Sequence, residues 1–274
     1  MIRRLIGFCK HLLMLTVSAA CIFPLLWMIS SSLKTQSTVF SDMSLFVRHP
    51  CWKNYVIAWV KGNFGVYFLN SVFYTVVIVG GILLISSLAA YAFARLEFPF
   101  RNFLFFLLLA PMMIPVPGGF VALYVLLNKL HLINTRIGYI LPQINAGLAM
   151  SIFLLKSFFE KIPRDLEDSA KIDGCSRLGI YWHICLPLAK PALAIVSIYN
   201  TLYVWNEYLL AMLILSNKSL MPLTRGLMIF RGEHVTQYPI LMAGMSLATI
   251  PIILIYLLMQ RRIVEGIMAG AIKG

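Results

Sequence analysis

The chain has 274 residues, of which 60% are hydrophobic and only 12% are charged, and its formal net charge at pH 7 is +13. Soluble domains average about 25% charged residues, so this composition excludes a water-soluble globular protein and indicates an integral membrane protein. In such a protein the excess of Lys and Arg points to topology and anionic lipid headgroups. No nucleic-acid-binding signature accompanies it, and we expect no nucleic-acid partner.

The amino-terminal stretch MIRRLIGFCKHLLMLTVSAACIFPLLWMI combines a basic start with an apolar run. Signal peptides share this pattern. However, the apolar run continues well past Cys21, and Ser18 stands where a lipoprotein cleavage box has a large aliphatic residue. We therefore expect a retained first transmembrane helix, with a removed signal as the alternative.

Six stretches are long and apolar enough to cross a membrane, which takes about 20 residues per helix. They are 11–33, 67–94, 103–127, 137–155, 190–214 and 240–260. Their apolar runs are continuous rather than alternating, which favours helices over barrel strands. The sequence thus predicts an all-α membrane protein with six transmembrane helices. It shows no convincing internal repeat, which fits half of a pore better than a whole transporter.

The third stretch is interrupted by prolines and glycines in the sequence APMMIPVPGGF, with Pro115 near its centre. Proline removes a helix hydrogen bond, and a membrane tolerates such a break where it is buried in protein or lines a wet cavity. Two interpretations stay open: a bend along a transport path, or a packed structural kink.

The distribution of Lys and Arg predicts the orientation. If the amino terminus is cytoplasmic, the larger share of these residues falls on the cytoplasmic side, as the positive-inside rule requires. Both termini and the segment 157–189 are then cytoplasmic. The loops around 34–66 and 215–239 lie outside.

Residues 161–177, KIPRDLEDSAKIDGCSR, are dense in charge, and we call them the charged segment. Pro163 suits a first helical turn, Gly174 a left-handed helix stop, and Ser176 the cap of a second helix. Apolar residues recur along both helices, at Ile162, Leu166 and Ala170 and at Leu178, Tyr181 and Cys185. The pattern predicts two short amphipathic helices at an angle. It favours docking to a protein over lying on lipid headgroups.

The longer stretch LEDSAKIDGCSRLGIYWHICLPLAKPAL resembles the EAA loop of binding-protein-dependent ABC importers. Asp168, Ser169, Ala170 and Gly174 occupy its E-A-A…G positions, with Asp in place of the usual Glu. The stretches NSVFYTVV, AAYAFARLEFPFRN and WNEYL and the tail QRRIVEGIMAGAIKG resemble carbohydrate-type permeases, particularly the maltose-permease-like half.

The resemblance implies a type I ABC importer permease fold and no enzyme activity of the chain itself. ATPase coupling would fall to Asp168, Ser169, Ala170, Asp173, Gly174, Leu186 and Pro187. The implied partners are a second homologous permease, two cytoplasmic ATPases that bind ATP and Mg, and an extracytoplasmic solute-binding protein. The sequence itself contains no phosphate-binding GxxxxGK[ST] motif. We expect no catalytic residue, no metal site and no cofactor in this chain.

Three parts of the chain follow from these expectations. Residues 1–66 hold the cytoplasmic amino terminus, the first transmembrane helix and an external loop. Residues 67–260 form the type-1 transmembrane domain, including the EAA loop at about 157–189, and residues 261–274 form a cytoplasmic tail. The expected location is the prokaryotic cytoplasmic membrane.

Glu207 is the only acidic residue inside a predicted span. A carboxylate inside a membrane should face protein or water, so Glu207 is either a polar group on the translocation path, with Asn206 and Pro115, or a hydrogen-bonded packing residue. An ion-gradient-driven secondary transporter is the alternative function, although it would call for more intramembrane carboxylates. A membrane-embedded enzyme is disfavoured because no catalytic constellation is visible.

Overall fold

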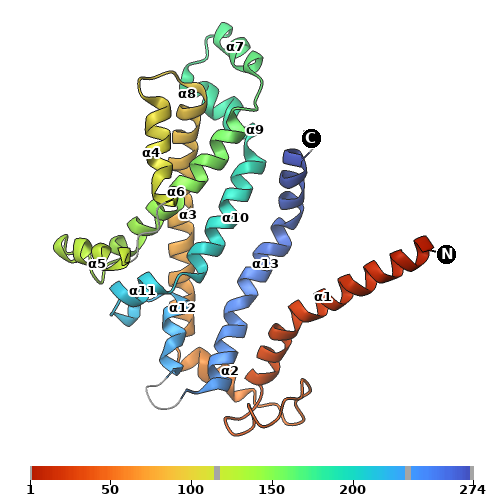
Figure 1. Ribbon diagram of the computed structural model, residues 1–274. Coiled ribbons are helices and arrows are strands. Elements are labelled where there is room, and N and C mark those ends of the chain that lie inside the picture. Colours follow the sequence, from red (N-terminus) through yellow and green to blue (C-terminus); the bar gives the residue numbers. More distant parts are fainter. Residues whose placement is uncertain (1, 114–117, 232–235, 272–274) are drawn as a thin grey trace. The chain divides into compact units, whose positions relative to one another are not determined.

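The computed structural model describes residues 2–113, 118–231 and 236–271, with side chains from residue 6 to residue 257 within these ranges. The regular secondary structure of this part is helical, and its only β contact is an isolated bridge between Arg231 and Thr236. The predicted all-α fold class is confirmed (Figure 1).

The chain forms two compact units, residues 1–68 with 223–251 and residues 69–222 with 252–274. The first unit contains α1 (Ile2–Ser32), α2 (Lys53–Val60), the start of α3 (Phe64–Arg95), α12 (Leu223–Gly226), η3 (Leu227–Phe230) and the start of α13 (Tyr238–Ala271). The second unit contains the rest of α3 and α13, together with α4 (Arg101–Met113), α5 (Gly119–Lys129), α6 (Arg136–Phe159), α7 (Arg164–Ile172), α8 (Arg177–Ile180), η1 (Tyr181–Cys185), α9 (Leu186–Leu188), α10 (Lys190–Asn206), α11 (Leu209–Ile214) and η2 (Lys218–Leu220).

In the first unit, polar side chains satisfy the carbonyl groups at the end of α1. A helix leaves its last four carbonyls without helical partners. The Asn54 amide of α2 donates to the carbonyls of Ser32 and Lys34, both at 2.8 Å. The buried Lys34 ammonium in turn donates to the carbonyls of Asp42 and Ser44. These bonds fix the turn that follows α1.

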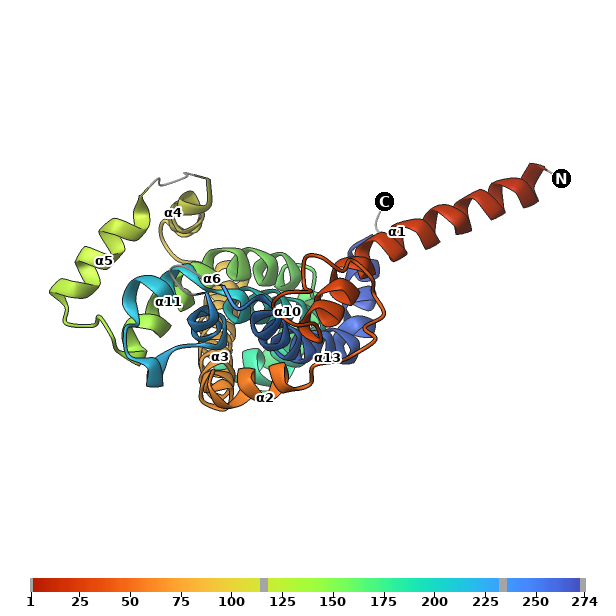
Figure 2. The same ribbon diagram turned by 90° about the horizontal axis from the view of Figure 1, so that it is seen from below.

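In the second unit, α3, α6 and α10 lie side by side (Figures 1 and 2). They meet at Gly147 of α6, where an added Cβ atom would lie 2.5 Å from Asn200 Oδ1 of α10 and 2.5 Å from Ile82 Cδ1 of α3. Asn200 also donates from Nδ2 to Ser151 Oγ at 3.0 Å. The helices therefore approach closely through a small residue and polar side chains, as helices commonly do within membranes.

Four described helices are long and apolar enough to span a membrane: α1 from Ile6, α3, α6 and α13 as far as Leu257. The third predicted span instead consists of two shorter apolar helices, α4 and α5. Pro111 lies inside α4, and Gly118 precedes α5 with φ of +74°. Pro115 and Pro117 lie outside the described residues, so the two interpretations of this interruption remain open.

The fifth predicted span, 190–214, is also divided. Its first part, α10, ends at Asn206 because Glu207 adopts an extended conformation with ψ of 124°. α11 then begins at Leu209. On the other side, α10 and the preceding stretch Arg177–Leu188 are bent relative to each other by 74°, and together they are long and apolar enough for a fifth span.

Candidate functional site: the charged segment and its attachment to α3

The charged segment forms the two short helices that its sequence predicts. Pro163 precedes α7, which starts at Arg164. Gly174 follows α7 with φ of +82°, a left-handed conformation that glycine adopts without steric cost. Ser176 then caps α8, its Oγ accepting from the Gly179 amide at 3.1 Å. The predictions for Gly174 and Ser176 are confirmed, whereas Pro163 lies just before the first turn of α7 rather than in it.

The apolar faces of these helices differ from the prediction. Ile162 and Ala170 are buried, but Leu166 between them is 44% exposed. Tyr181 and Cys185 are buried in η1, whereas Leu178 is 63% exposed. The predicted stripes are therefore wrong in part, because one member of each, Leu166 or Leu178, is exposed while the others are buried.

Apolar side chains of α7, α8 and η1 remain exposed. Leu166 and Ile172 belong to α7, Leu178 to α8 and Trp182 to η1, and Ile172 is 87% exposed. The buried side chains pack into one apolar cluster with α3, α4, α6 and α10. The segment is thus anchored on one side and presents hydrophobic side chains on the other.

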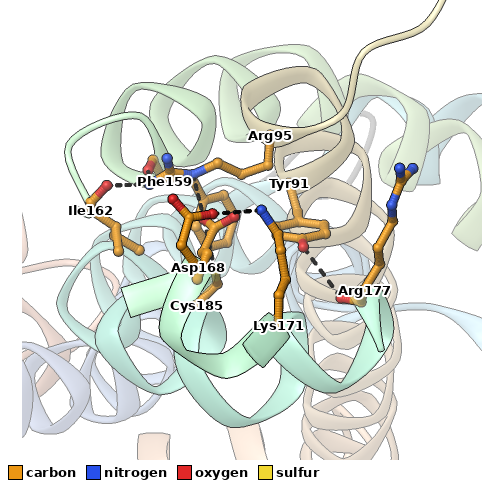
Figure 3. A network of polar contacts seen from close by, with 9 residues as sticks. Tyr91, Arg95, Phe159, Ile162, Asp168, Lys171, Arg177 and Cys185 are labelled. Carbon is orange, nitrogen blue, oxygen red and sulfur yellow. Dashed lines mark hydrogen bonds and ion pairs between the residues drawn. The ribbon is translucent and has the colours of Figure 1, made fainter. Parts of the chain in front are cut away.

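A buried ion pair attaches α7 to the end of α3, and Figure 3 shows its arginine, Arg95. Arg95 Nε of α3 lies 2.9 Å from Glu167 Oε1, and the two side chains are 3% and 9% exposed. This contact is electrostatic, since the Nε–H is not aligned for a hydrogen bond. The same guanidinium donates to the carbonyl groups of Phe159, the last residue of α6, and Ile162, which follows that helix. Arg95 therefore joins three parts of the chain.

Two further polar contacts continue along the same helix. Tyr91 OH donates to the Arg177 carbonyl at 3.2 Å, which attaches α3 to α8. Ser87 Oγ and Tyr181 OH are 2.8 Å apart, which attaches α3 to η1. Residues 87, 91 and 95 are spaced by four and therefore share one face of α3.

Asp168, next to Glu167 in the sequence, has the opposite environment. It is exposed and accepts from Lys171 Nζ at 2.8 Å. This hydrogen bond, with the lysine charge, lowers the pKa of Asp168 below its usual value, so the side chain is ionised at neutral pH. Being exposed, the pair adds little to stability.

The other predicted coupling residues occupy different environments. Ala170 is buried, whereas Ser169, Asp173 and Gly174 are exposed. Ser169 Oγ donates back to the Asp165 carbonyl at 2.6 Å. Leu186 is half-buried and Pro187 exposed in α9. Five of the predicted coupling residues therefore lie in α7 or in the turn that follows it. Leu186 and Pro187 lie in a different helix, α9.

Of the predicted path residues, Glu207 and Asn206 make helix-end contacts. The Glu207 carboxylate accepts from the amides of Leu210 at 2.8 Å and Ala211 at 3.1 Å, and so caps α11. Tyr139 OH donates to it at 3.5 Å. Asn206 is exposed and donates to the Leu202 carbonyl at 2.8 Å. Pro115 lies outside the described residues.

Arg95 and Glu167 were not predicted as site residues. The sequence did contain a signal, because Ser87, Tyr91 and Arg95 are polar groups at spacing four near the end of an apolar helix. Glu167 gave less indication, because an acid near a helix amino terminus is favoured without any partner. In the part of the chain that the structure describes, no three His, Cys, Asp or Glu side chains are grouped to hold a metal ion.

The site is thus a polar helical segment fixed to one end of α3, a helix long and apolar enough to span a membrane. Residues 81–268 match the family of binding-protein-dependent transport system inner membrane components, and the chain belongs to this family. The family consists of transport subunits rather than enzymes. The family description places it in a membrane, as the composition predicts.

Two named permease proteins align with this chain over nearly its whole length. An ABC transporter permease protein of Caldicellulosiruptor sp. strain Rt8B.4 is 40% identical over 92% of this chain and 91% of its own length. The diacetylchitobiose uptake system permease protein of Streptomyces coelicolor is 33% identical over 96% of this chain and 88% of its own.

A solved structure has the same fold. A chain of a bacterial ABC transporter involved in the import of the acidic polysaccharide alginate superposes with a TM-score of 0.82. The match covers 94% of this chain and 96% of that one, at 24% sequence identity. The predicted ABC importer permease fold is thereby confirmed.

Proposed function

We propose that this chain forms half of the translocation pathway of an ABC importer and is driven by a separate ATPase that docks on the segment 157–189. The observation that carries the proposal is the exposure of Leu166, Ile172, Leu178 and Trp182 on the helices of that segment. Apolar side chains on short helices outside a bilayer are typical of a surface that fits a partner's groove. The exposed Asp168 carboxylate adds a group for a basic residue of the partner.

The other half of the pathway is a second, homologous permease. The complete importer contains two ATPase subunits, which bind ATP and Mg, and an extracytoplasmic binding protein that delivers the solute. Both termini and the charged segment face the cytoplasm, where the ATPases are. The membership of a binding-protein-dependent family supports this set of partners.

The solute is a sugar or an oligosaccharide. The likeness to a diacetylchitobiose uptake permease over nearly the whole chain supports this class of substrate. The alternative, an ion-gradient-driven transporter, receives no support from Glu207, because its carboxylate caps α11 rather than standing among other acids.

Reconstitution tests the proposal. The chain is coexpressed with a partner permease and ATPase from its own genome and inserted into proteoliposomes containing ATP and Mg. Labelled mono- and oligosaccharides are added outside with the binding protein. We expect uptake that requires every subunit and stops when the P-loop lysine of the ATPase is replaced. Uptake by this chain alone under an ion gradient would overturn the proposal.

A further inference from the structure

We propose that Ser87, Tyr91 and Arg95 act together as a polar ladder that makes α3 and the charged segment move as one body. The inference deepens the proposed function, on which it rests for the source of the motion. In this account, Arg95 and Glu167 are positioning residues: they contact neither ATP nor the transported solute.

The contacts of the ladder extend from the charged segment into η1, which follows it. Ser87 contacts η1, Tyr91 contacts α8 and Arg95 contacts α7. One face of one helix thus holds three successive elements at three separate points. A segment held at one point can pivot, whereas a segment held at three points along a rigid helix follows that helix.

The contact of Arg95 involves the most partners of the three. The Arg95 guanidinium is nearly inaccessible and serves one carboxylate and two carbonyl groups. Arginine suits this role because its planar group presents several donors in fixed directions. Removing Arg95 alone would leave the buried Glu167 charge without compensation, which folded proteins strongly disfavour.

The neighbouring acids Glu167 and Asp168 lie on different sides of α7. Successive residues on a helix point about 100° apart, so Glu167 turns toward α3 while Asp168 turns toward solvent. Glu167 holds α7 on this chain and Asp168 remains available to a partner. The partner's movement therefore reaches α3 through α7 and the ladder.

Pulsed electron spin resonance can measure whether α7 and α3 move together. One spin label is attached to the exposed native Cys175, which follows Gly174. The second is attached to a cysteine replacing Val76, which is 67% exposed on α3. Cys9, Cys21 and Cys51 are replaced by serine, and the importer is assembled in lipid nanodiscs with and without Mg–ATP.

For the unaltered ladder we expect one narrow distance distribution, whose position stays the same when Mg–ATP is added. In Arg95→Gln the distribution should broaden, and its mean should shift with Mg–ATP. The double variant Arg95→Met/Glu167→Leu should broaden in the same way, although it leaves no buried charge unpaired. Distributions in both variants as narrow as in the unaltered chain would overturn the ladder.

Glu160→Gln provides the matched control, because it breaks the Lys156–Glu160 pair, in which Glu160 is 48% exposed, near the same helix end. It should leave the distribution unchanged, and broadening there as large as in Arg95→Gln would contradict the assignment to Arg95. The nucleotide-free widths test the ladder without any ATPase. If no ATPase copurifies and Mg–ATP shifts the distance distribution of no variant, the proposed function is wrong. The widths measured without nucleotide still test whether the ladder holds α7 against α3.

Discussion

Glu167 and Asp168 show how strongly the environment of one side chain can differ from that of its neighbour. Both are acids in the first half of α7, yet one is buried against Arg95 and the other is paired with Lys171 in solvent. The energetic consequences of replacing them should differ accordingly. This contrast gives a test that needs no knowledge of the solute.

Glu167→Gln should lower the free energy of unfolding by about 3–5 kcal/mol, since it leaves the Arg95 charge buried without its partner. Asp168→Asn should leave the unfolding temperature unchanged, because the side chain is exposed. Thermal unfolding of the purified chain in detergent measures both. Equal losses in the two variants would contradict the burial of Glu167.

Gly147 is the second side-chain position with a clear expectation. Gly147→Leu should destabilise the chain by about 1–3 kcal/mol, because the new side chain overlaps Asn200 and Ile82 where three helices meet. Gly80→Ala is its control, since a Cβ atom there meets nothing within 4 Å. The same thermal measurement checks both, and an unaffected Gly147→Leu would show that the helices are not in close contact.

Among the helices and turns, the features set by local chemistry were predictable from the sequence. Gly174 ends α7 and Ser176 caps α8 as expected, because each effect depends on residues within one turn. The attachment of the charged segment was not predictable. It depends on Arg95 and Glu167, which are far apart in sequence, and no local pattern states which acid of the segment turns inward.

Two predicted spans are divided into shorter helices, and the sequence predicted only one of the two divisions. The prolines and glycines of the third span predicted an interruption, and the structure has two short helices there. The end of α10 at Asn206 was not foreseen, because an apolar run continues through it. The chain leaves α10 at Glu207, and the carboxylate of Glu207 caps the next helix, α11.

The turn between α7 and α8 should tolerate only glycine at position 174. Gly174→Val places a β-branched residue at φ of +82°, at a cost above the about 1–2 kcal/mol that a left-handed conformation imposes on ordinary residues. We expect reduced ATPase copurification and weaker coupling of ATP hydrolysis to uptake.

Gly179→Ala is the matched substitution, because its new Cβ atom would make only an ordinary contact with Ser176 Oγ at 3.4 Å. ATPase copurification with this variant should equal that of the unaltered chain. If Gly174→Val also copurified normally and stayed fully coupled, the turn would have no part in docking.

At the scale of the whole molecule, the chain has the features of an ABC transporter permease. It has apolar helices for a bilayer, belongs to a family of binding-protein-dependent transport components, and carries no phosphate-binding motif in its sequence. In the proposed function, transport depends on contact with a separate ATPase through the exposed side chains of the segment 157–189. That contact is the step to examine first.

Site-specific photocrosslinking examines it directly. A benzophenone amino acid replaces Ile172, which is 87% exposed on α7, and the importer is irradiated in membranes with and without Mg–ATP. The control position is Met43, which is 78% exposed in the loop predicted to lie outside. We predict an adduct between position 172 and the ATPase whose yield changes with Mg–ATP, and none from position 43. Absence of the ATPase adduct at position 172 in an assembled, active importer would contradict the account.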